Sequence, residues 1–388
     1  MTFAPADARE AAEIVRAAEA PFDIVGGATR GFGRPPAGEA RLSSAGLSGV
    51  IFHEPAEMTL RARAGTPVRE VEARLAAAEQ MLPFEPMDPR PLFGTTGEPT
   101  VGGLVASGLA GPRRLSAGAV RDNVLGIEFV NGRGEIIRAG GRVTKNVTGL
   151  DLVKISCGAL GTLGLITEAT FKLLPRPRAQ STIVIRRLDD IRATQAMARA
   201  LGSPFGVSGA ATIHAGMGRE FPRTLLRVEG FEDSVAYRAE RLIALLADFG
   251  AKHALIGEDS QRIWQAIRDG AFLAEPTERA VWRASLKPSD APSALAALGE
   301  NAHASLIDLG GGLIWFSTDP TPQAAARVRA ALGGFPGHAE LVRADAGLKA
   351  RADVFTPLTP ALARLTRGVK RSLDPRALFN PGRMYASA

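Results

Sequence analysis

One stretch of the chain, residues 94–166, constrains the fold more than any other, because glycine recurs along it between Ser, Thr and Arg. Its glycine-rich segments are Gly97-Glu98-Pro99-Thr100-Val101-Gly102-Gly103, residues 107–114, residues 121–126 and Gly161-Thr162-Leu163-Gly164-Leu165-Ile166. Glycines of this kind let the backbone approach a ligand closely, and exposed N–H groups in such turns attract anions. The stretch therefore predicts a ligand that carries phosphate.

A second glycine loop lies near the start of the chain. A capping-box pattern at Asp7 predicts a helix over about residues 7–20, and residues 22–25 then predict a short buried strand. The strand leads directly into Gly26-Gly27-Ala28-Thr29-Arg30-Gly31-Phe32-Gly33, whose amides and Thr29 hydroxyl are able to bind an anion. The loop matches neither G-x-G-x-x-G nor a Walker sequence. Taken alone, it fits a phosphate loop and a plain tight turn equally well.

Composition sets limits on the class of protein. A chain of 388 residues with 45% hydrophobic and 22% charged content is expected to form two or three globular domains. The net charge of +7 comes from scattered arginines rather than from a basic block, so we expect an anionic small ligand or an acidic partner, and no nucleic acid. A single cysteine, Cys157, excludes a disulfide framework within the chain and is too little to hold an iron–sulfur cluster.

The compartment is also predicted from the sequence. Residues 1–20 contain four acidic residues and no apolar run, so we expect no signal peptide. No apolar stretch approaches the roughly 20 residues that a membrane span needs. We therefore expect a cytoplasmic protein without an integral membrane segment, or one that is peripheral to the inner face of the membrane through its partners.

The rest of the pattern predicts two domains and a tail. In the first domain we expect a strand at 58–64 and then a helix to about 79, with Thr66 as N-cap and Pro67 at N1. A proline-rich loop at 82–89, a helix at 102–109 and a hairpin of 124–130 with 135–138 are expected next. The domain would end with a polar turn at 144–151, a short helix carrying Lys154 and Cys157, and a strand at 164–174. Beyond Pro175-Arg176-Pro177, strands at 181–187, 224–230 and 304–309 alternate with helices at 192–201, 234–249 and 323–332, which favours an α+β domain with a mostly antiparallel sheet.

The last segment is expected to pack on a domain. Residues 362–372 predict a helix, and residues 374–383 form a polar turn segment with a buried Phe379. The expected divisions are residues 1–178 and 179–360 as domains and residues 361–388 as a tail that returns to the first domain.

In this order and spacing, the motifs resemble the flavoenzyme superfamily of vanillyl-alcohol oxidase and para-cresol methylhydroxylase. The matching segments are Gly26–Thr29, Pro86–Asp88, Thr100–Gly103, Ser107–Arg114, Arg121–Asp122, Thr144–Asp151, Gly158–Glu168, Asp374-Pro375 and Phe379–Arg383. The resemblance implies an α+β fold in which a two-part FAD-binding domain of the para-cresol methylhydroxylase type carries an α+β cap.

Three features point to a narrower resemblance. Compact segments at Gly111–Arg114 and Thr144–Asp151, together with a cap of modest length, are similar to the FAD-binding subunits of bacterial glycolate oxidase. Such subunits assemble with a larger flavin-type subunit and an iron–sulfur subunit. The resemblance implies an FAD-dependent oxidoreductase subunit that takes part in the oxidation of a small 2-hydroxyacid and passes electrons toward the iron–sulfur partner.

The same resemblance implies the residues that bind FAD. The first loop and Ser107–Arg114 would hold the pyrophosphate, Thr100–Gly103 would lie along the cofactor, and Gly161, Gly164 and Ile166 would meet the adenine or ribitol side. The implied cofactor residues are Gly26, Gly27, Ala28, Thr29, Arg30, Pro86, Thr100, Gly102, Gly103, Ser107, Gly108, Arg113, Arg114, Gly118, Arg121, Asp122, Gly161, Gly164 and Ile166. Arginines suit a diphosphate, although a surface salt bridge would equally explain Arg113, Arg114 or Arg121 taken singly.

Departures from the superfamily pattern shape the functional prediction. Ala28 and Gly97-Glu98 occupy the neighbourhoods where other members carry a His or Cys that tethers flavin, so we expect non-covalent FAD. Residues 307–314 lack the histidines of the metal-binding strand found in large 2-hydroxyacid dehydrogenases, so we predict no metal site, and the catalytic residues stay unknown because the sequence offers no candidate for a catalytic base. Two alternatives stay open: a self-sufficient FAD-dependent dehydrogenase of another alcohol or hydroxyacid, and a non-catalytic scaffold with the flavin fold.

Other polar and aromatic residues carry weaker predictions. Lys145 and Asn146 fit a position near the flavin ring and a capped turn equally well. The five histidines are scattered without metal-ligand spacing, and we expect the three tryptophans, Trp264, Trp282 and Trp315, to lie in the core.

Overall fold

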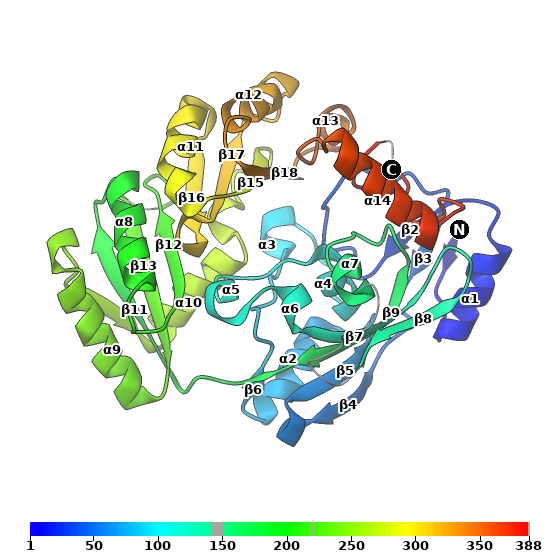
Figure 1. Cartoon of the computed structure of the whole chain (residues 1–388), viewed down its shortest axis with the longest axis horizontal. Coiled ribbons are helices and arrows are strands. Elements are labelled where there is room, and N and C mark those ends of the chain that lie inside the picture. The colour runs from blue at the N-terminus through cyan, green and yellow to red at the C-terminus, as the bar shows by residue number, and fades with distance from the viewer. Residues whose placement is uncertain (142–150, 219, 387–388) are drawn as a thin grey trace. The chain divides into compact units, whose positions relative to one another are not determined.

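All of the glycine-rich stretch except Gly111–Ala117 belongs to a unit that is assembled from three separate parts of the chain. The computed structural model describes residues 1–141, 151–218 and 220–386. Its unit 1 comprises Met1–Ala110, Gly118–Pro175 and Pro357–Ala388, and its unit 2 comprises Gly111–Ala117 and Arg176–Thr356 (Figure 1). Divisions expected after residues 178 and 360 lie close to these limits. That the parts fold as independent domains stays a prediction.

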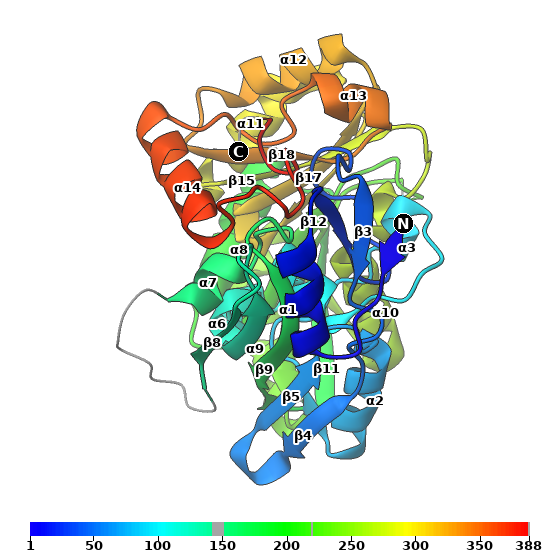
Figure 2. The same ribbon diagram turned by 90° about the vertical axis from the view of Figure 1, so that its right-hand side faces the viewer.

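Unit 1 begins with a small parallel sheet and the helix α1 (Ala8–Ala17). The sheet has the order β1-β3-β2, formed by β1 (Thr2–Phe3), β2 (Phe22–Val25) and β3 (Ala40–Ser43). Asp7 Oδ1 accepts hydrogen bonds from the amides of Arg9 and Glu10, while Glu10 Oε2 accepts one from the amide of Ala6, which confirms the capping pattern. Helix α1 packs against β7 and β8. It lies at the right of Figure 1 and therefore faces the viewer in Figure 2.

A five-stranded antiparallel sheet forms the main core of unit 1. Its order is β4-β5-β9-β7-β8, formed by β4 (Val50–Glu54), β5 (Thr59–Arg63), β7 (Val124–Val130), β8 (Ile136–Gly140) and β9 (Leu165–Lys172). The other elements are α2 (Val68–Ala77), α3 (Arg90–Phe93), α4 (Val101–Ser107), α6 (Val120–Asn123), α7 (Leu152–Ser156) and the pair β6 (Gln80–Met81) with β10 (Leu174–Pro175). The predicted hairpin at Asn131-Gly132-Arg133-Gly134 is confirmed, since β7 pairs with β8.

The expected start of the second helix is wrong by one residue. Pro67 is the N-cap of α2 and provides no side-chain cap, because proline has no oxygen in its side chain. Thr66, predicted as the cap, uses its hydroxyl on another turn, where Oγ1 donates to the Gly49 carbonyl at 3.2 Å and accepts from the Gly49 amide at 2.9 Å.

The C-terminal segment packs on unit 1. Helix α14 (Pro360–Leu373) carries Lys370, whose Nζ donates to Asp374 Oδ2 at 2.6 Å and to the carbonyls of Thr162 and Phe379 at 2.6 and 2.8 Å. Asp374 in turn accepts from the amides of Leu378 and Phe379. Phe379 is fully buried beside α1 and β2 in the smaller core of the unit.

Unit 2 is built on one eight-stranded sheet in which every neighbouring pair is antiparallel. The order is β14-β11-β13-β12-β16-β17-β15-β18. The strands are β11 (Ala179–Arg186), β12 (Val207–Ile213), β13 (Arg223–Gly230), β14 (His253–Ile256), β15 (Ala280–Leu286), β16 (Ala304–Asp308), β17 (Leu313–Thr318) and β18 (Gly337–Arg343). The predicted α+β class with a mostly antiparallel sheet is confirmed.

Helices cover both faces of this sheet. On one face, α8 (Asp190–Leu201), α9 (Glu232–Leu245), α11 (Ala291–Leu298) and α12 (Pro322–Leu332) share the core with Ile183 and Ile185 of β11. On the other face, α10 (Gly257–Arg268) brings Trp264 to Thr182, whose Oγ1 accepts a hydrogen bond from Nε1 at 2.8 Å. Two further helices, α5 (Arg114–Ala117) and α13 (Ala346–Arg351), complete the unit. All three tryptophans are buried, as predicted.

Candidate functional site

The two glycine loops of unit 1 lie in direct backbone contact. A Cβ atom added at Gly27 would lie 1.6 Å from the carbonyl oxygen of Glu98, and one added at Gly97 would lie 1.8 Å from that of Gly27. Side chains are therefore impossible at either position. Ala28 follows with a φ of 54°, in the left-handed region that favours glycine. The loop after β2 and the loop before α4, which the sequence predicted separately, thus form one structure.

Helix α4 starts against these loops. Thr100 is its N-cap, and Thr100 Oγ1 accepts a hydrogen bond from the amide of Gly103 at 3.3 Å. A Cβ atom at Gly26 would lie 2.5 Å from that same oxygen, and one at Gly102 would lie 2.9 Å from the Ala64 Cβ. Close packing of β2, β5 and α4 therefore explains why Gly26 and Gly102 carry no side chain.

Arg30 brings a buried positive charge to the loops. Its Nη1 donates to Thr29 Oγ1 at 3.4 Å and lies 3.2 Å from where a Cβ atom of Gly103 would be. Its Nε is buried and has no hydrogen-bond partner among the described residues. Burial lowers the pKa of Arg30 to about 10, against the attraction of Asp88, so the side chain stays charged at neutral pH. A buried cation with an unused donor beside side-chain-free backbone fits a phosphate group.

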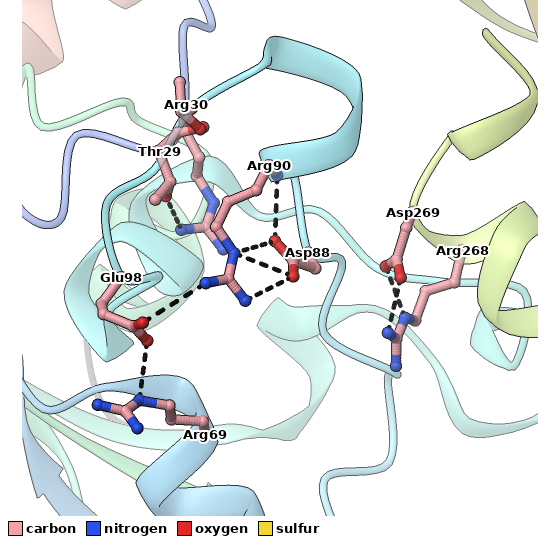
Figure 3. A network of polar contacts seen from close by, with 9 residues as sticks. Thr29, Arg30, Arg69, Asp88, Arg90, Glu98, Arg268 and Asp269 are labelled. Carbon is pink, nitrogen blue, oxygen red and sulfur yellow. Dashed lines mark hydrogen bonds and ion pairs between the residues drawn. The ribbon is translucent and has the colours of Figure 1, made fainter. Parts of the chain in front are cut away.

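A chain of ion pairs holds the surrounding loops in place (Figure 3). Arg90 donates from Nε and Nη2 to the two oxygens of Asp88 at 3.0 and 2.8 Å, and its Nη1 lies 3.5 Å from Glu98 Oε1. Glu98 also meets Arg69 of α2, Nε to Oε2, at 2.9 Å. The network joins the proline-rich loop, which includes the buried Pro86, to the loop before α4.

The tail completes the same region. Asn380 Oδ1 accepts from the Ile24 amide at 2.8 Å, while its Nδ2 donates to the Leu160 carbonyl at 2.7 Å. A Cβ atom at Gly161 would lie 2.8 Å from that Nδ2. Asn380 therefore connects β2, which leads into the first loop, with the Gly161 turn. The structure brings together three of the segments that the sequence predicted: Gly26–Arg30, Thr100–Gly103 and the turn at Gly161.

Other predicted residues have mainly packing contacts. Gly164 packs against β7, where a Cβ atom would lie 2.6 Å from the Val130 carbonyl oxygen, and Ile166 is buried in the core of unit 1. Ser107 donates from Oγ to the Leu104 carbonyl at 3.1 Å, and Gly108 ends α4 with a φ of 63°. Both lie at the opposite end of α4 from Thr100.

The predicted arginines after α4 have different surroundings. Arg113 and Arg114 belong to unit 2, where Arg113 donates from Nη2 and Nε to Glu229 at 2.7 and 3.1 Å. Farther on, Arg121 is 60% exposed and lies 3.8 Å from Asp122. Asp122 accepts from the Ala119 amide at 2.8 Å and closes a turn at Gly118, whose φ is 79°. Arg113 and Arg121 thus form salt bridges, which was the alternative explanation for these arginines. That the arginines bind FAD stays a prediction.

Sequence reasoning missed one further cation. Arg383 contacts the first loop, since a Cβ atom at Gly33 would lie 3.2 Å from its Nε, and its carbonyl accepts from the Arg34 amide at 2.8 Å. Burial lowers the pKa of Arg383, opposed by Asp23. The sequence signal that could have indicated Arg383 is the tail motif Asn380-Pro381-Gly382-Arg383. Lys145 and Asn146 lie outside the described residues.

Cys157 and the histidines have no arrangement typical of a redox or metal centre. Burial raises the pKa of the Cys157 thiol to about 12, with Asp151 and Asp122 adding to the effect, so the thiol is protonated and unreactive at neutral pH. Within residues 1–141, 151–218 and 220–386, no three His, Cys, Asp or Glu side chains are grouped to hold a metal ion. Over the same residues, no helix has the length and apolar character to cross a membrane.

Comparison with known proteins agrees with this geometry. Residues 1–140 match the model of the FAD binding domain family. Glycolate oxidase subunit GlcE of Escherichia coli (strain K12) is 37% identical over 94% of this chain and 93% of its own. Glycolate oxidase subunit GlcD of Bacillus subtilis (strain 168) is 39% identical over 28% of this chain and 23% of its own.

The fold has also been seen before. The crystal structure of p-cresol methylhydroxylase with substrate bound superimposes with a TM-score of 0.73 at 14% identity, covering 99% of this chain and 88% of that chain. The predicted architecture of the para-cresol methylhydroxylase type is thereby confirmed. Because the identity to the GlcE subunit extends over nearly the whole of both chains, the chain belongs to the family of the glycolate oxidase subunit GlcE, a family of FAD-binding oxidoreductases.

Proposed function

We propose that the chain is the FAD-binding subunit of a glycolate (2-hydroxyacid) oxidase complex that passes electrons from hydroxyacid oxidation toward an iron–sulfur partner. The observation that carries the proposal is the similarity to the GlcE subunit over 94% of the chain. When bound, FAD accepts a hydride from the alcohol and releases electrons singly. The partners would be a larger flavin-type subunit and an iron–sulfur subunit, and the complex would be cytoplasmic or peripheral at the inner face of the membrane.

In this proposal, the chain's own residues hold the FAD pyrophosphate. Arg30 would use its buried Nε as a charge-assisted donor to a phosphate oxygen, and backbone amides of the Gly26–Ala28 loop would donate to the same anion. Arg383, which lies beside Gly33 of the same loop, would add a second charge. A pyrophosphate carries two negative charges, which two guanidinium groups offset.

The FAD is proposed to be non-covalent. Ala28 and Gly97-Glu98 stand where a tether would be expected, and the chain's single cysteine has a raised pKa of about 12. Denaturing the purified yellow protein with acid tests this point. Flavin released into the supernatant supports the proposal, whereas flavin that stays with the precipitated chain contradicts it.

Anaerobic addition of glycolate tests the reaction. The chain is purified alone and also after co-expression with the two other subunits, and bleaching of the flavin absorbance is followed in both samples. Bleaching only in the complex supports the proposed subunit function. Bleaching by the chain alone, with turnover of an artificial acceptor, favours a self-sufficient dehydrogenase. A colourless chain that takes up no FAD contradicts the proposal and favours a scaffold.

A further inference from the structure

An apolar trough runs along one edge of the sheet in unit 2. It is a hollow of about 500 Å³ whose wall is α9 and whose floor is β11 and β14. Val235, Ala239 and Ile243 of α9 line the wall, and they share one face of the helix because they are spaced four residues apart. From the floor it receives Ala254 and Ile256 of β14. We call this feature the α9 trough.

The trough exists because the sheet is one strand wider than the helix layer on this face. Helix α9 lies against β11 and β13, and β14 is the next strand beyond β11 and the last of the sheet. Ala254 pairs with Ile183, which faces the α9 side, so Ala254 and Ile256 face that side too. Helix α10, which also contacts β14, packs Trp264 on the other face, and Gly257 and Gln261 at its start also line the trough. The figure of the fold shows α9 over β11 (Figure 1).

The exposed surface of the trough is unusually apolar. Ile256, which lines the trough, is 73% exposed, and Phe231, the N-cap of α9 just outside the lining, is 69% exposed. Large apolar side chains that gather on an exposed sheet edge mark a surface that is covered in an assembly, because such an edge left open promotes aggregation.

Size and charge identify what covers it. Helix α9 covers β11 and β13, and among the described residues no other helix covers the same face of β14, so a further helix packed about 8–10 Å from α9 would fill that place. Glu232 and Glu240 line the trough, both exposed, about 12 Å apart along α9. Arg178, the cation of the lining, lies over the Phe231 ring at 5.8 Å. Two carboxylates against one guanidinium give the trough a negative charge.

We propose that the α9 trough binds an amphipathic helix of the larger flavin-type subunit of the oxidase complex. The helix would present an apolar stripe to Ile256 and Val235 and would carry Lys or Arg beside the stripe, opposite Glu232 and Glu240. The proposal rests on the proposed function, since it takes the partner from the glycolate oxidase complex. It goes beyond that function by assigning the surface at which the complex is held together.

Two pairs of variants test the proposal in the full chain, co-expressed with the two other subunits. Ile256→Glu places a charge in the trough, and Ile191→Glu, at a 61% exposed isoleucine on α8 of the same unit, is its matched control. Glu232→Lys with Glu240→Lys reverses the charge, and Glu300→Lys, at another exposed glutamate of unit 2, is the control. Because these positions are exposed, all variants should keep the flavin content and melting temperature of the wild-type chain.

The measurement is the dissociation constant of the chain for the larger flavin-type subunit. We expect Ile256→Glu and the double charge reversal each to weaken binding at least tenfold, and the two controls to stay within about twofold. In the wild-type complex, amide exchange should slow in residues 231–243 and 253–257. Binding that is indifferent to Ile256→Glu and to the charge reversal overturns this proposal while leaving the proposed function intact.

Two other outcomes also decide the matter. The wild-type chain could form a dimer with itself that Ile256→Glu dissociates, while binding to the other subunits is unchanged. In that case the trough binds a second copy of this chain and the proposal is wrong. If the wild-type chain assembles with neither subunit, both this proposal and the proposed function are wrong.

Discussion

Arg30 combines a charge that the fold buries with a donor that the fold leaves unused. A buried donor without a partner costs roughly 1–3 kcal/mol of stability, so its presence in a natural chain calls for a functional reason. Arg121, also predicted to bind FAD, is exposed and close to Asp122. At the scale of single residues, the two arginines therefore differ in a way that experiments can separate.

Arg30→Met tests the role of Arg30. The change keeps the apolar stem and removes the charged donor, so we expect FAD to bind roughly 10- to 100-fold more weakly, as for the loss of one charge-assisted hydrogen bond. The FAD-free protein should melt at the same or a higher temperature, because the unused buried donor is gone. Fluorescence titration with FAD and a thermal melt measure the two effects.

Arg121→Ala is the control, and it should leave FAD affinity within about twofold of the wild type. Equal losses in the two variants would contradict the assignment. So would a loss of FAD binding by Arg30→Met that merely follows a lower melting temperature.

His214 gives unit 2 a pH-dependent contribution to stability. Its ring lies between Asp190 Oδ1, 2.7 Å from Nε2, and the Ser305 carbonyl, 2.8 Å from Nδ1. Burial opposes protonation of the ring, but the hydrogen bond and charge of Asp190 outweigh it and raise the pKa of His214. Because the folded state holds the proton more tightly, this stability is fully present below the unfolded pKa of about 6.5 and is lost as pH rises through the folded pKa.

His214→Gln should therefore be most destabilising at low pH. We expect the difference in unfolding free energy between the wild type and the variant to shrink between about pH 6 and pH 8, as measured by urea unfolding. A difference that grows with pH would refute this reading of His214.

At the scale of elements, α14 is held by one buried lysine. Lys370→Met leaves the fully buried Asp374 carboxylate without its cation and two carbonyls without a donor, so we expect a loss of about 3–5 kcal/mol of unfolding free energy. Adding Asp374→Asn should recover part of the loss, because the uncompensated charge disappears. Urea unfolding measures both, and limited proteolysis should cut the single variant within residues 357–386. A Lys370→Met chain as stable as the wild type would contradict the role given to the tail.

The elements that the sequence predicted well are those with local signals. The capping pattern at Asp7, the glycine-bearing hairpin at 131–134 and the polar tail are all specified by neighbouring residues, as are the glycine loops, where backbone contact forbids a side chain. These same loops make up the candidate site, and for that reason most of it was predictable.

Several of the elements that the sequence missed are buried on both faces, and other errors involve distant partners. Strand β12 is buried at every position, so its residues do not alternate between polar and apolar, and β15 and β17 are nearly as buried. The pairing of Arg113 with Glu229 joins residues that are 116 positions apart and leaves no mark in the local sequence. Thr66 was misjudged for the same reason, since its hydroxyl is taken by Gly49.

At the scale of the whole molecule, the chain passes between the two units after Ala110, Ala117, Pro175 and Thr356. The first segment of unit 2 is only Gly111–Ala117, and the ion pair between Arg113 and Glu229 binds it to the rest of that unit. Arg113 is 12% exposed and Glu229 is 7% exposed, and Glu229 also meets Arg227 Nε at 3.2 Å and accepts from Ser208 Oγ at 2.6 Å. A short segment bound this way is part of unit 2, although the sequence around it belongs to the FAD-binding domain.

Arg113 therefore has two competing roles, as an anchor in unit 2 or as a ligand of the FAD pyrophosphate, and Arg113→Ala separates them. As an anchor, its loss should cost about 1–3 kcal/mol of unfolding free energy, less than for an isolated buried pair because Glu229 keeps Arg227. A double-mutant cycle with Glu229→Gln should then give a coupling energy of about 0.5–3 kcal/mol, and FAD affinity should stay within about twofold. A coupling energy near zero, combined with a loss of FAD affinity as large as that expected for Arg30→Met, would instead make Arg113 a ligand of the pyrophosphate.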